Sequence, residues 1–293
     1  SGDRRGARAA HSAAASAGAD PSPPPPLAVR IPGGLPPSEL RLARWLIRRV
    51  RSDSLAPRLL ANRTFGAGAA GGSQETLFLH LHADRWAPAL RRALQAAAAR
   101  GDAQAGWNVS RGFPASLALR CIERISYLAA ADQQPAPVGW HGDGGTLMTM
   151  VAMLSPPASF EGGAIQFQGE EHEGRWEEFS DLEPGDVVVW RGWTWHRAAP
   201  LVRGRREVLA AEWWRGPDCA STIVPRMADS PATLRHAAAL DPSSSRLRRW
   251  LGAALCQPGR PCEDADDAAA AKAAYVRAVA LAPADARARM ELG

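Results

Sequence analysis

The chain has 293 residues, of which 46% are hydrophobic and 22% are charged, enough apolar material for one good-sized core and a smaller additional unit. No apolar run reaches the roughly 18 residues of a membrane-spanning helix, so we expect no membrane span. The net charge is +5 and Lys272 is the one lysine, but the arginines are interleaved with acidic residues. A nucleic-acid-binding protein needs a clustered basic face, so we expect no nucleic-acid partner.

The first part of the chain divides into a low-complexity head and a helical region. Residues 1–35 are rich in Ala, Ser, Gly and Pro, and we expect them to be disordered, with a polyproline stretch at 23–26. A helix is predicted from Pro36 onward with Ser38 as its N-cap. The alternating segment 75–82 predicts a strand, and residues 83–100 predict a helix that Gly101 ends.

A series of short strands follows from about residue 115. The segments typical of strands are 116–130, 146–154, 163–168, 186–192 and 206–214. Gly- and Pro-rich segments typical of turns separate them, and these include 191–200 and 202–205. Many short strands with no helix between them indicate an antiparallel barrel or double-sheet jelly roll. We therefore predict an α+β fold, with a jelly-roll core at about 115–216 inside a domain spanning 36–229, and with N-terminal helices covering one face.

The last segment, 230–293, returns to helical text. Leu240-Asp241-Pro242 recurs as Leu281-Ala282-Pro283, and the segment resembles roughly one and a half tetratricopeptide repeats. An ordinary helical hairpin that caps the barrel explains the same text equally well. Either version offers a surface for a protein partner.

The cysteines and the glycosylation sequons are weak signals of the cellular compartment in which the protein resides. Cys256 and Cys262 flank a short loop and would pair in an oxidising compartment, although two free thiols fit equally well. Asn62 and Asn108 stand in sequons that suit a secretory route through the endoplasmic reticulum. The chain begins at Ser1, so a removed leader and a continuation past Gly293 both stay open.

The glycine-flanked motif "GWHGDGG" carries the strongest chemical signal. In an extended segment, residues i and i+2 point to the same side, so His141 and Asp143 converge on one point. His196 follows an apolar strand and a tight turn, which is a suitable position for a third ligand. Two imidazoles and one carboxylate form the facial triad of non-haem Fe(II) oxygenases, which leaves three metal positions open.

A basic residue for a co-substrate lies ten positions after His196. On a strand at 206–214, Arg206 shares a face with Val208, Ala210 and Glu212, whereas Arg205 points the other way. A planar guanidinium suits the distal carboxylate of 2-oxoglutarate.

The ordered set "WHGDGGTLMTMVAML", "FEGGAIQF" and "PGDVVVWRGWTWHRAAPLVRGRR" resembles the prolyl 4-hydroxylase-like branch of the 2-oxoglutarate/Fe(II) dioxygenases, which includes the procollagen prolyl and lysyl hydroxylases. The resemblance implies a double-stranded β-helix core with flanking helices. It assigns Fe(II) to His141, Asp143 and His196 as catalytic metal ligands, and the 2-oxoglutarate carboxylate to Arg206.

The resemblance also implies an activity: hydroxylation of an unactivated C–H bond, with O₂ and 2-oxoglutarate as co-substrates and ascorbate in support. A prolyl residue in a polypeptide is the expected substrate; a lysyl residue or a small molecule stays open. Members of the family usually place a hydroxyl near 2-oxoglutarate, for which Tyr127 and Thr149 are the candidates here. Two other classes stay open, a zinc-dependent enzyme on a similar barrel and a non-catalytic protein that acts through its C-terminal helices.

Overall fold

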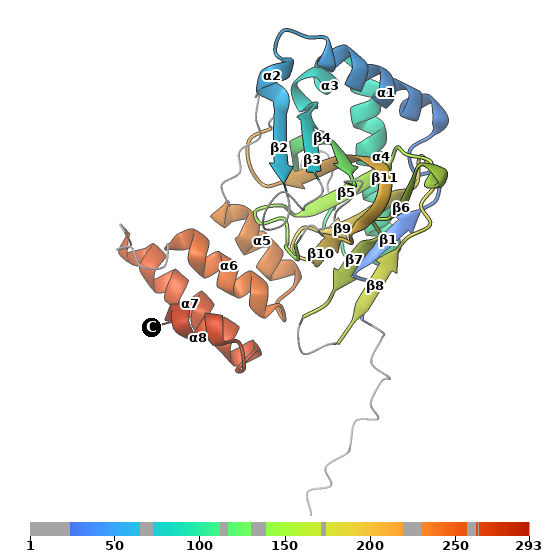
Figure 1. Ribbon diagram of the computed structural model, residues 1–293. Helices are drawn as coiled ribbons and strands as arrows, with labels where there is room; N and C mark the ends of the chain where they lie inside the picture. The colour runs from blue at the N-terminus through green and yellow to red at the C-terminus, as the bar shows by residue number, and fades with distance from the viewer. Residues whose placement is uncertain are drawn as a thin grey trace, which may run out of the picture.

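The computed structural model describes eight stretches of the chain, namely 24–64, 73–111, 117–129, 139–170, 174–218, 230–256, 262 and 264–292. They fold into a sheet core with helices packed on one side and a group of helices at the C-terminal end (Figure 1). Within these stretches, no helix is long and apolar enough to cross a membrane.

Two antiparallel sheets make up the core. The larger sheet has the order β1-β9-β5-β11-β4-β3-β2, with β6 paired to β11, and the smaller has the order β10-β7-β8. The strands of the larger sheet are β1 Ala28–Ile31, β2 Leu60–Thr64, β3 Ser73–Phe78, β4 Ala118–Leu128, β5 Met148–Met153, β6 Phe160–Gly162, β9 Val187–Arg191 and β11 Leu201–Trp214. Those of the smaller sheet are β7 Ile165–Gln168, β8 Trp176–Phe179 and β10 Trp195–Ala198.

Apolar side chains fill the space between the two sheets. Phe167 of β7 is fully buried and belongs to one cluster with Val151, Trp190 and Val208 of the larger sheet. Two antiparallel sheets that close on a shared core form a jelly roll. The predicted α+β jelly-roll fold with flanking helices is therefore confirmed.

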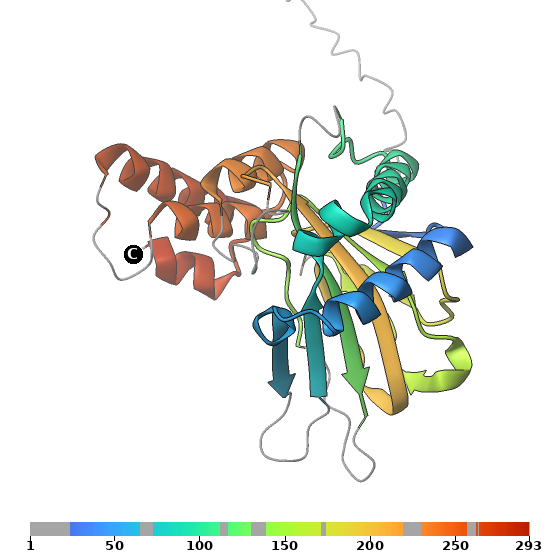
Figure 2. The same cartoon turned by 90° about the horizontal axis from the view of Figure 1, so that it is seen from above.

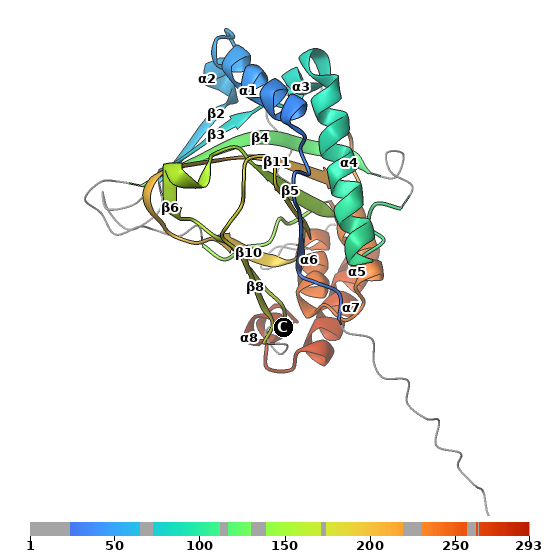
Figure 3. The same cartoon turned by 90° about the vertical axis from the view of Figure 1, so that its right-hand side faces the viewer.

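The outer face of the larger sheet is covered by the N-terminal helices, as Figures 2 and 3 show. They are α1 Pro37–Arg51, α2 Ala56–Leu59, α3 His80–Trp86 and α4 Pro88–Ala105, and a 3-10 turn, η1 Pro157–Ser159, precedes β6. The α1 helix buries Leu40, Ala43, Leu46 and Val50, the 3–4 residue spacing of an amphipathic helix.

The ends of these helices differ from the prediction. Pro36 is the N-cap of α1, and Ser38 lies inside the first turn, where its hydroxyl caps no backbone amide. The α4 helix runs through Gly101 and ends at Gly106, whose φ of 70° is the left-handed conformation that glycine adopts freely. Gly101 is present because the helix lies close to the sheet there, since an added Cβ would be 2.7 Å from Cγ2 of Val189.

Part of the predicted disordered head is ordered. Residues 28–31 form β1, which pairs with β9 in the register Ala28↔Trp190 to Ile31↔Val187. Leu27, Val29 and Leu35 are buried. The prediction of disorder up to residue 35 was wrong because Pro and Gly flank a short apolar strand at the sheet edge. Residues 1–23, including the start of the polyproline stretch, lie outside the described residues.

Three further local predictions were wrong. The segment 202–205, predicted as a turn, belongs to β11, which bends at Gly204 (φ 81°) and continues its pairing. The segment 191–200, also predicted as a turn, contains β10. The predicted strand at 75–82 ends at Phe78, and His80 and His82 lie in α3 as buried residues.

Four helices follow the sheet, α5 Pro231–Leu240, α6 Ser245–Leu255, α7 Ala265–Leu281 and α8 Ala286–Leu292. A disulfide joins Cys256 at the end of α6 to Cys262. Leu234, Ala237 and Leu247 belong to the same buried cluster as the helices and large sheet of the core. The C-terminal helices are thus packed onto the jelly roll, and their kinship to tetratricopeptide repeats stays a prediction.

The close approach of Gly101 to Val189 allows a test of how tightly α4 packs on β9. Alanine is the better helix former by about 1 kcal/mol, so Gly101→Ala would stabilise an unconstrained helix. Here the new methyl group meets the β-branched Val189, and overpacking of this kind costs about 1–3 kcal/mol. We expect the free energy of unfolding to fall in urea denaturation, whereas Ala103→Gly at an exposed position of the same helix reports helix propensity alone. An increase in stability for Gly101→Ala would show that α4 does not press on β9.

Candidate metal centre

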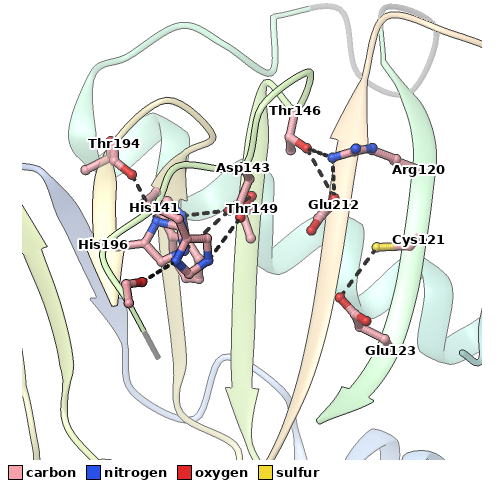
Figure 4. Close-up of polar contacts among 12 residues, drawn as sticks. Arg120, Cys121, Glu123, His141, Asp143, Thr146, Thr149, Thr194, His196 and Glu212 are labelled. Atoms are coloured by element: carbon pink, nitrogen blue, oxygen red, sulfur yellow. Dashed lines mark hydrogen bonds and ion pairs between the residues drawn. The ribbon is translucent and has the colours of Figure 1, made fainter. Parts of the chain in front are cut away.

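The three predicted metal ligands come together at one end of the jelly roll. His141 and His196 form an isolated antiparallel bridge, in which each backbone N–H donates to the other's carbonyl, at 3.0 and 2.8 Å. The backbone N–H of Asp143 donates to the carbonyl of Gly192 at 2.8 Å. These bonds attach the loop before β5 to β10 and to the turn before it, and all three side chains point toward one another (Figure 4).

The ligand atoms of the three side chains are close enough to share one ion. His141 Nε2 lies 3.8 Å from Asp143 Oδ1, and His196 Nε2 lies 3.6 Å from Asp143 Oδ2. One ligand atom of each residue lies within 4.8 Å of the other two. The period-2 prediction for His141 and Asp143 therefore agrees with the geometry.

Backbone carbonyls orient both imidazoles. His141 Nδ1 lies 2.8 Å from the carbonyl of Gly139, and His196 Nδ1 lies 2.9 Å from that of Thr194. Because a carbonyl only accepts hydrogen bonds, these contacts favour the tautomer in which Nδ1 carries the proton and Nε2 is free to bind a metal. Burial also lowers the pKa of His196, with the Asp143 carboxylate opposing that effect, so the neutral ring that binds a metal is favoured.

Two donors hold the Asp143 carboxylate in place. The Thr149 hydroxyl donates to Oδ2 at 2.7 Å, and Trp190 Nε1 donates to the same oxygen at 3.2 Å. The other oxygen, Oδ1, has neither bond and faces His141. Thr149 was a candidate partner of 2-oxoglutarate, but its hydroxyl is used to orient a metal ligand.

The donor set fits a metal that keeps open positions. Two imidazole nitrogens and one carboxylate on one side of a site are the non-haem Fe(II) arrangement. A structural zinc site is closed by four protein ligands. Among the residues that the structure describes, no fourth His, Cys or acidic side chain joins this group.

A pocket of about 620 Å³ opens beside the triad. Its walls include the three metal ligands, apolar residues of β5, β7 and β11, and residues of the C-terminal helices α6 and α8. The face of β11 predicted from the sequence lines it, namely Arg206, Val208, Ala210 and Glu212. A pocket of this size fits a small co-substrate together with part of a second substrate.

Arg206 is a buried cation of this pocket. The side chain is 3% exposed, and its Nε has no hydrogen-bond partner. No described carboxylate forms an ion pair with it, and burial lowers the pKa of its guanidinium. Its Cζ lies 5.4 Å from the ring centre of Tyr127, the residue paired with it across β4 and β11. Arg205, the rival candidate, is exposed.

A second group of possible metal ligands, Cys121, Glu123 and Glu212, lines the same pocket. Glu212 already accepts from Arg120 at 2.9 Å and from Thr146 at 3.2 Å, contacts that Figure 4 shows. Burial raises the pKa of the Cys121 thiol well above its usual value and also raises the pKa of Glu212. A metal needs the thiolate and the free carboxylate, so this group is a poorer metal site than the triad.

The main contribution that the sequence did not reveal comes from α6. A Cβ added at Gly142, between two metal ligands, would be 2.3 Å from Cη2 of Trp250. Trp250 and Arg249 of α6 line the pocket, as do Arg287 and Glu291 of α8. A glycine between the ligands was the available signal, because it marks a close approach, but nothing in the sequence identifies the approaching residue.

No family model matches the chain, and no curated protein matches it. Among solved structures, a 2OG-Fe(II) oxygenase family oxidoreductase from Burkholderia pseudomallei is similar, with 14% identity, 67% of this chain and 88% of that chain covered, and a TM-score of 0.46.

Two further structures are similar to a comparable extent. A prolyl-4-hydroxylase from Pseudomonas putida has 15% identity and a TM-score of 0.41, with 65% of this chain and 94% of that one covered. The α-ketoglutarate-dependent epimerase SnoN from nogalamycin biosynthesis has 18% identity and a TM-score of 0.43, with 66% and 78% covered.

The bond from Thr149 to Asp143 predicts a loss of metal affinity on its removal. Thr149→Val keeps the shape of the buried side chain and removes the hydroxyl, so Oδ2 loses its shorter hydrogen bond. Partners of metal ligands are typically worth 10–100-fold in affinity, and we expect Mn(II) binding, followed by electron paramagnetic resonance of free Mn(II), to weaken about tenfold. Thr149→Ser is the control that restores binding. Unchanged affinity in the valine variant would show that the hydroxyl does not orient Asp143.

The contact between Gly142 and Trp250 predicts coupling between the two positions. Gly142→Ala pushes the ligand loop against the indole, so we expect Mn(II) affinity to fall about tenfold. In a Trp250→Ala background the space is open, and the same substitution is expected to cost less than about threefold. Purely additive effects in this double-mutant cycle would contradict the packing of α6 on the metal loop.

Proposed function

We propose that this protein is a 2-oxoglutarate- and Fe(II)-dependent dioxygenase that hydroxylates an unactivated C–H bond. The observation that carries the proposal is that one pocket contains both a set of three metal ligands and the buried guanidinium of Arg206, which forms no ion pair with a described carboxylate. Either feature by itself would fit several kinds of site, but together they match an open metal site and a dicarboxylate co-substrate.

Arg206 supports the proposal on energetic grounds. A buried charge without a counter-charge is costly, so folded proteins pair such groups. The distal carboxylate of 2-oxoglutarate supplies the missing anion, and a hydrogen bond to a charged group is worth about 1.5–3 kcal/mol. Tyr127, whose ring lies beside the guanidinium, is the remaining candidate for a hydroxyl contact to the same co-substrate.

In this site, His141, Asp143 and His196 would hold Fe(II), and the bound iron would supply the oxidising chemistry with O₂ and 2-oxoglutarate. The protein's own contribution is positioning. Val151, Ile165 and Val208 give the pocket apolar walls next to the ligands, which limits the access of water. Thr149 and Trp190 keep one carboxylate oxygen of Asp143 engaged.

The alternative of a zinc-dependent enzyme accounts for the triad but not for Arg206, because such chemistry has no use for a distal carboxylate clamp. The alternative of a non-catalytic protein leaves the oriented histidines unexplained.

We further propose that the substrate is a prolyl residue of a polypeptide. The half-buried tryptophans Trp195 and Trp250, which line the pocket, support a ring-containing substrate.

The experiment is an anaerobic titration of Fe(II)-loaded protein with 2-oxoglutarate, in which the weak visible charge-transfer band of the chelate is measured. We expect the band in the wild-type protein, its loss in His141→Ala, and at least a tenfold weaker affinity for 2-oxoglutarate in Arg206→Ala. Arg205→Ala is the matched control, since it removes an adjacent but exposed guanidinium.

The absence of the band in folded, iron-loaded protein would overturn the proposal. Equal losses in Arg205→Ala and Arg206→Ala would also contradict it, because they would show a general effect of charge rather than a specific clamp.

A further inference from the structure

The turn between β9 and β10 holds two of the three metal ligands through its backbone. It is closed by the N–H of Thr194, which donates to the carbonyl of Arg191 at 2.8 Å. The carbonyl of Gly192 accepts from the N–H of Asp143 at 2.8 Å. The carbonyl of Thr194 lies 2.9 Å from Nδ1 of His196. The position of this turn therefore affects where both ligands lie.

Asp241, in the connection between α5 and α6, contacts this turn through one carboxylate oxygen. Its Oδ2 accepts from Nε1 of Trp193 at 3.0 Å and lies 3.2 Å from Nη1 of Arg191. Its Oδ1 accepts from the Ser243 hydroxyl at 2.9 Å. Trp193 is 3% exposed and the Asp241 side chain is 16% exposed, so the contact lies where water has little access. Hydrogen bonds to a charged acceptor in such a place are among the stronger ones in proteins.

Further bonds join the start of α6 to the strands around the turn. Nη1 of Arg246, in α6, donates to the carbonyl of Trp193 at 3.3 Å. The hydroxyls of Ser244 and Ser245 donate to the carboxylate of Glu170, at 2.5 and 3.0 Å. Glu170 follows β7, and β7 pairs with β10. The connection between α5 and α6 is thus bonded both to the turn before β10 and to the end of the neighbouring strand.

A comparison within the chain separates this carboxylate from the needs of the helix end. Asp241 is the C-cap of α5, with φ −128° and ψ 78°, and its N–H donates to the carbonyl of Ala237. Ala282, at the corresponding place in the recurring Leu-x-Pro segment, is the C-cap of α7, with φ −135° and ψ 79°, and its N–H donates to Ala278. An alanine therefore ends a helix in this conformation, so the helix end does not require an acidic side chain.

We propose that Asp241 is a positioning residue of the metal centre, and that α5 and α6 are thereby a functional part of that centre. Asp241 holds the side chains of Trp193 and Arg191, and the backbone of the same turn holds Asp143 and His196. Without the carboxylate, a nearly buried indole N–H loses its acceptor, which is costly enough to displace the turn. Figure 1 shows α5 and α6 beside the end of the sheets that carries β10.

The test is the affinity of the full chain for Mn(II), followed by electron paramagnetic resonance of the free ion, together with the visible absorption of the Co(II)-loaded protein. Asp241→Ala removes both contacts with the turn. Asp241→Asn keeps an oxygen for Trp193 and removes the charge opposite Arg191. Asp264→Ala is the matched control, because it removes an exposed carboxylate that caps α7 in the same group of helices.

We expect Mn(II) affinity to fall about tenfold in Asp241→Ala and about threefold in Asp241→Asn, since groups that orient metal ligands are typically worth 10–100-fold. At saturating Co(II), the absorption of Asp241→Ala is expected to change shape because the ligands are displaced. A loss of stability alone lowers the folded fraction and leaves that shape unchanged. Asp264→Ala, which loses only a helix cap, is expected to keep the wild-type affinity and spectrum. Asparagine has nearly the shape of aspartate, so the test stays decisive if Asp241→Ala does not fold.

This inference rests on the proposed function in one respect, namely that the triad binds a metal, and the two fail in different ways. Wild-type affinity and spectrum in both Asp241 variants would overturn the inference and leave the proposed function intact. Equal losses in Asp241→Ala and Asp264→Ala would also overturn it, because they would show a general effect of helix stability. No Mn(II) binding by the wild-type protein would overturn the metal centre itself and the proposed function with it.

Discussion

The reciprocal backbone hydrogen bonds between His141 and His196 are the contact on which the rest of the site depends. They join the glycine-rich loop before β5 to the strand β10 of the opposite sheet. A ligand in this loop and a ligand in β10 are thereby held next to each other. Side-chain bonds then refine what the backbone has fixed, since the Nδ1 atoms are committed to carbonyls and one oxygen of Asp143 is committed to Thr149 and Trp190. A metal site assembled this way is pre-organised before any ion enters.

The charged groups of the pocket differ in whether they already have a partner of opposite charge. At one end Arg206 is a buried cation with no carboxylate among the described residues, whereas Glu212 is already paired with Arg120. The site thus offers an uncompensated positive charge to an incoming anion. Val151, Ile165 and Val208 are apolar wall residues of the pocket, and such residues strengthen electrostatic contacts by keeping the local dielectric constant low. Residues of the C-terminal helices also line the pocket, so the jelly roll and these helices form it together.

The sequence predicted the parts of the site that depend on strand periodicity. His141 and Asp143 converge on one point, as their two-residue spacing predicted, and Arg206 faces the pocket with Val208 because β11 alternates. It failed where tertiary packing decides. Nothing local shows that Trp250 meets Gly142, since more than a hundred residues separate them. The family resemblance made Thr149 one of two candidates for a contact to the co-substrate, whereas only the fold shows that its hydroxyl donates to Asp143.

The fold was predicted with the same strengths and weaknesses. The strands in the centre of the sheets are long or apolar enough to be recognised directly, and the jelly-roll class follows from their number. The edge strand β1 was missed because Pro and Gly on both sides conceal its short apolar run. The bend at Gly204 was predicted as a turn because glycine is common both in turns between strands and at bends within a strand. Only the pairing of β11 with β6 and β4 shows that the strand continues through this position.

The most direct test of the central claim is diffraction from crystals grown anaerobically with Fe(II) and 2-oxoglutarate, measured on both sides of the iron absorption edge. We predict an anomalous peak bounded by Nε2 of His141, Nε2 of His196 and the carboxylate of Asp143, with the far carboxylate of 2-oxoglutarate on Arg206. Iron at Cys121, Glu123 and Glu212, or a bound 2-oxoglutarate that leaves Arg206 without a carboxylate, would contradict it.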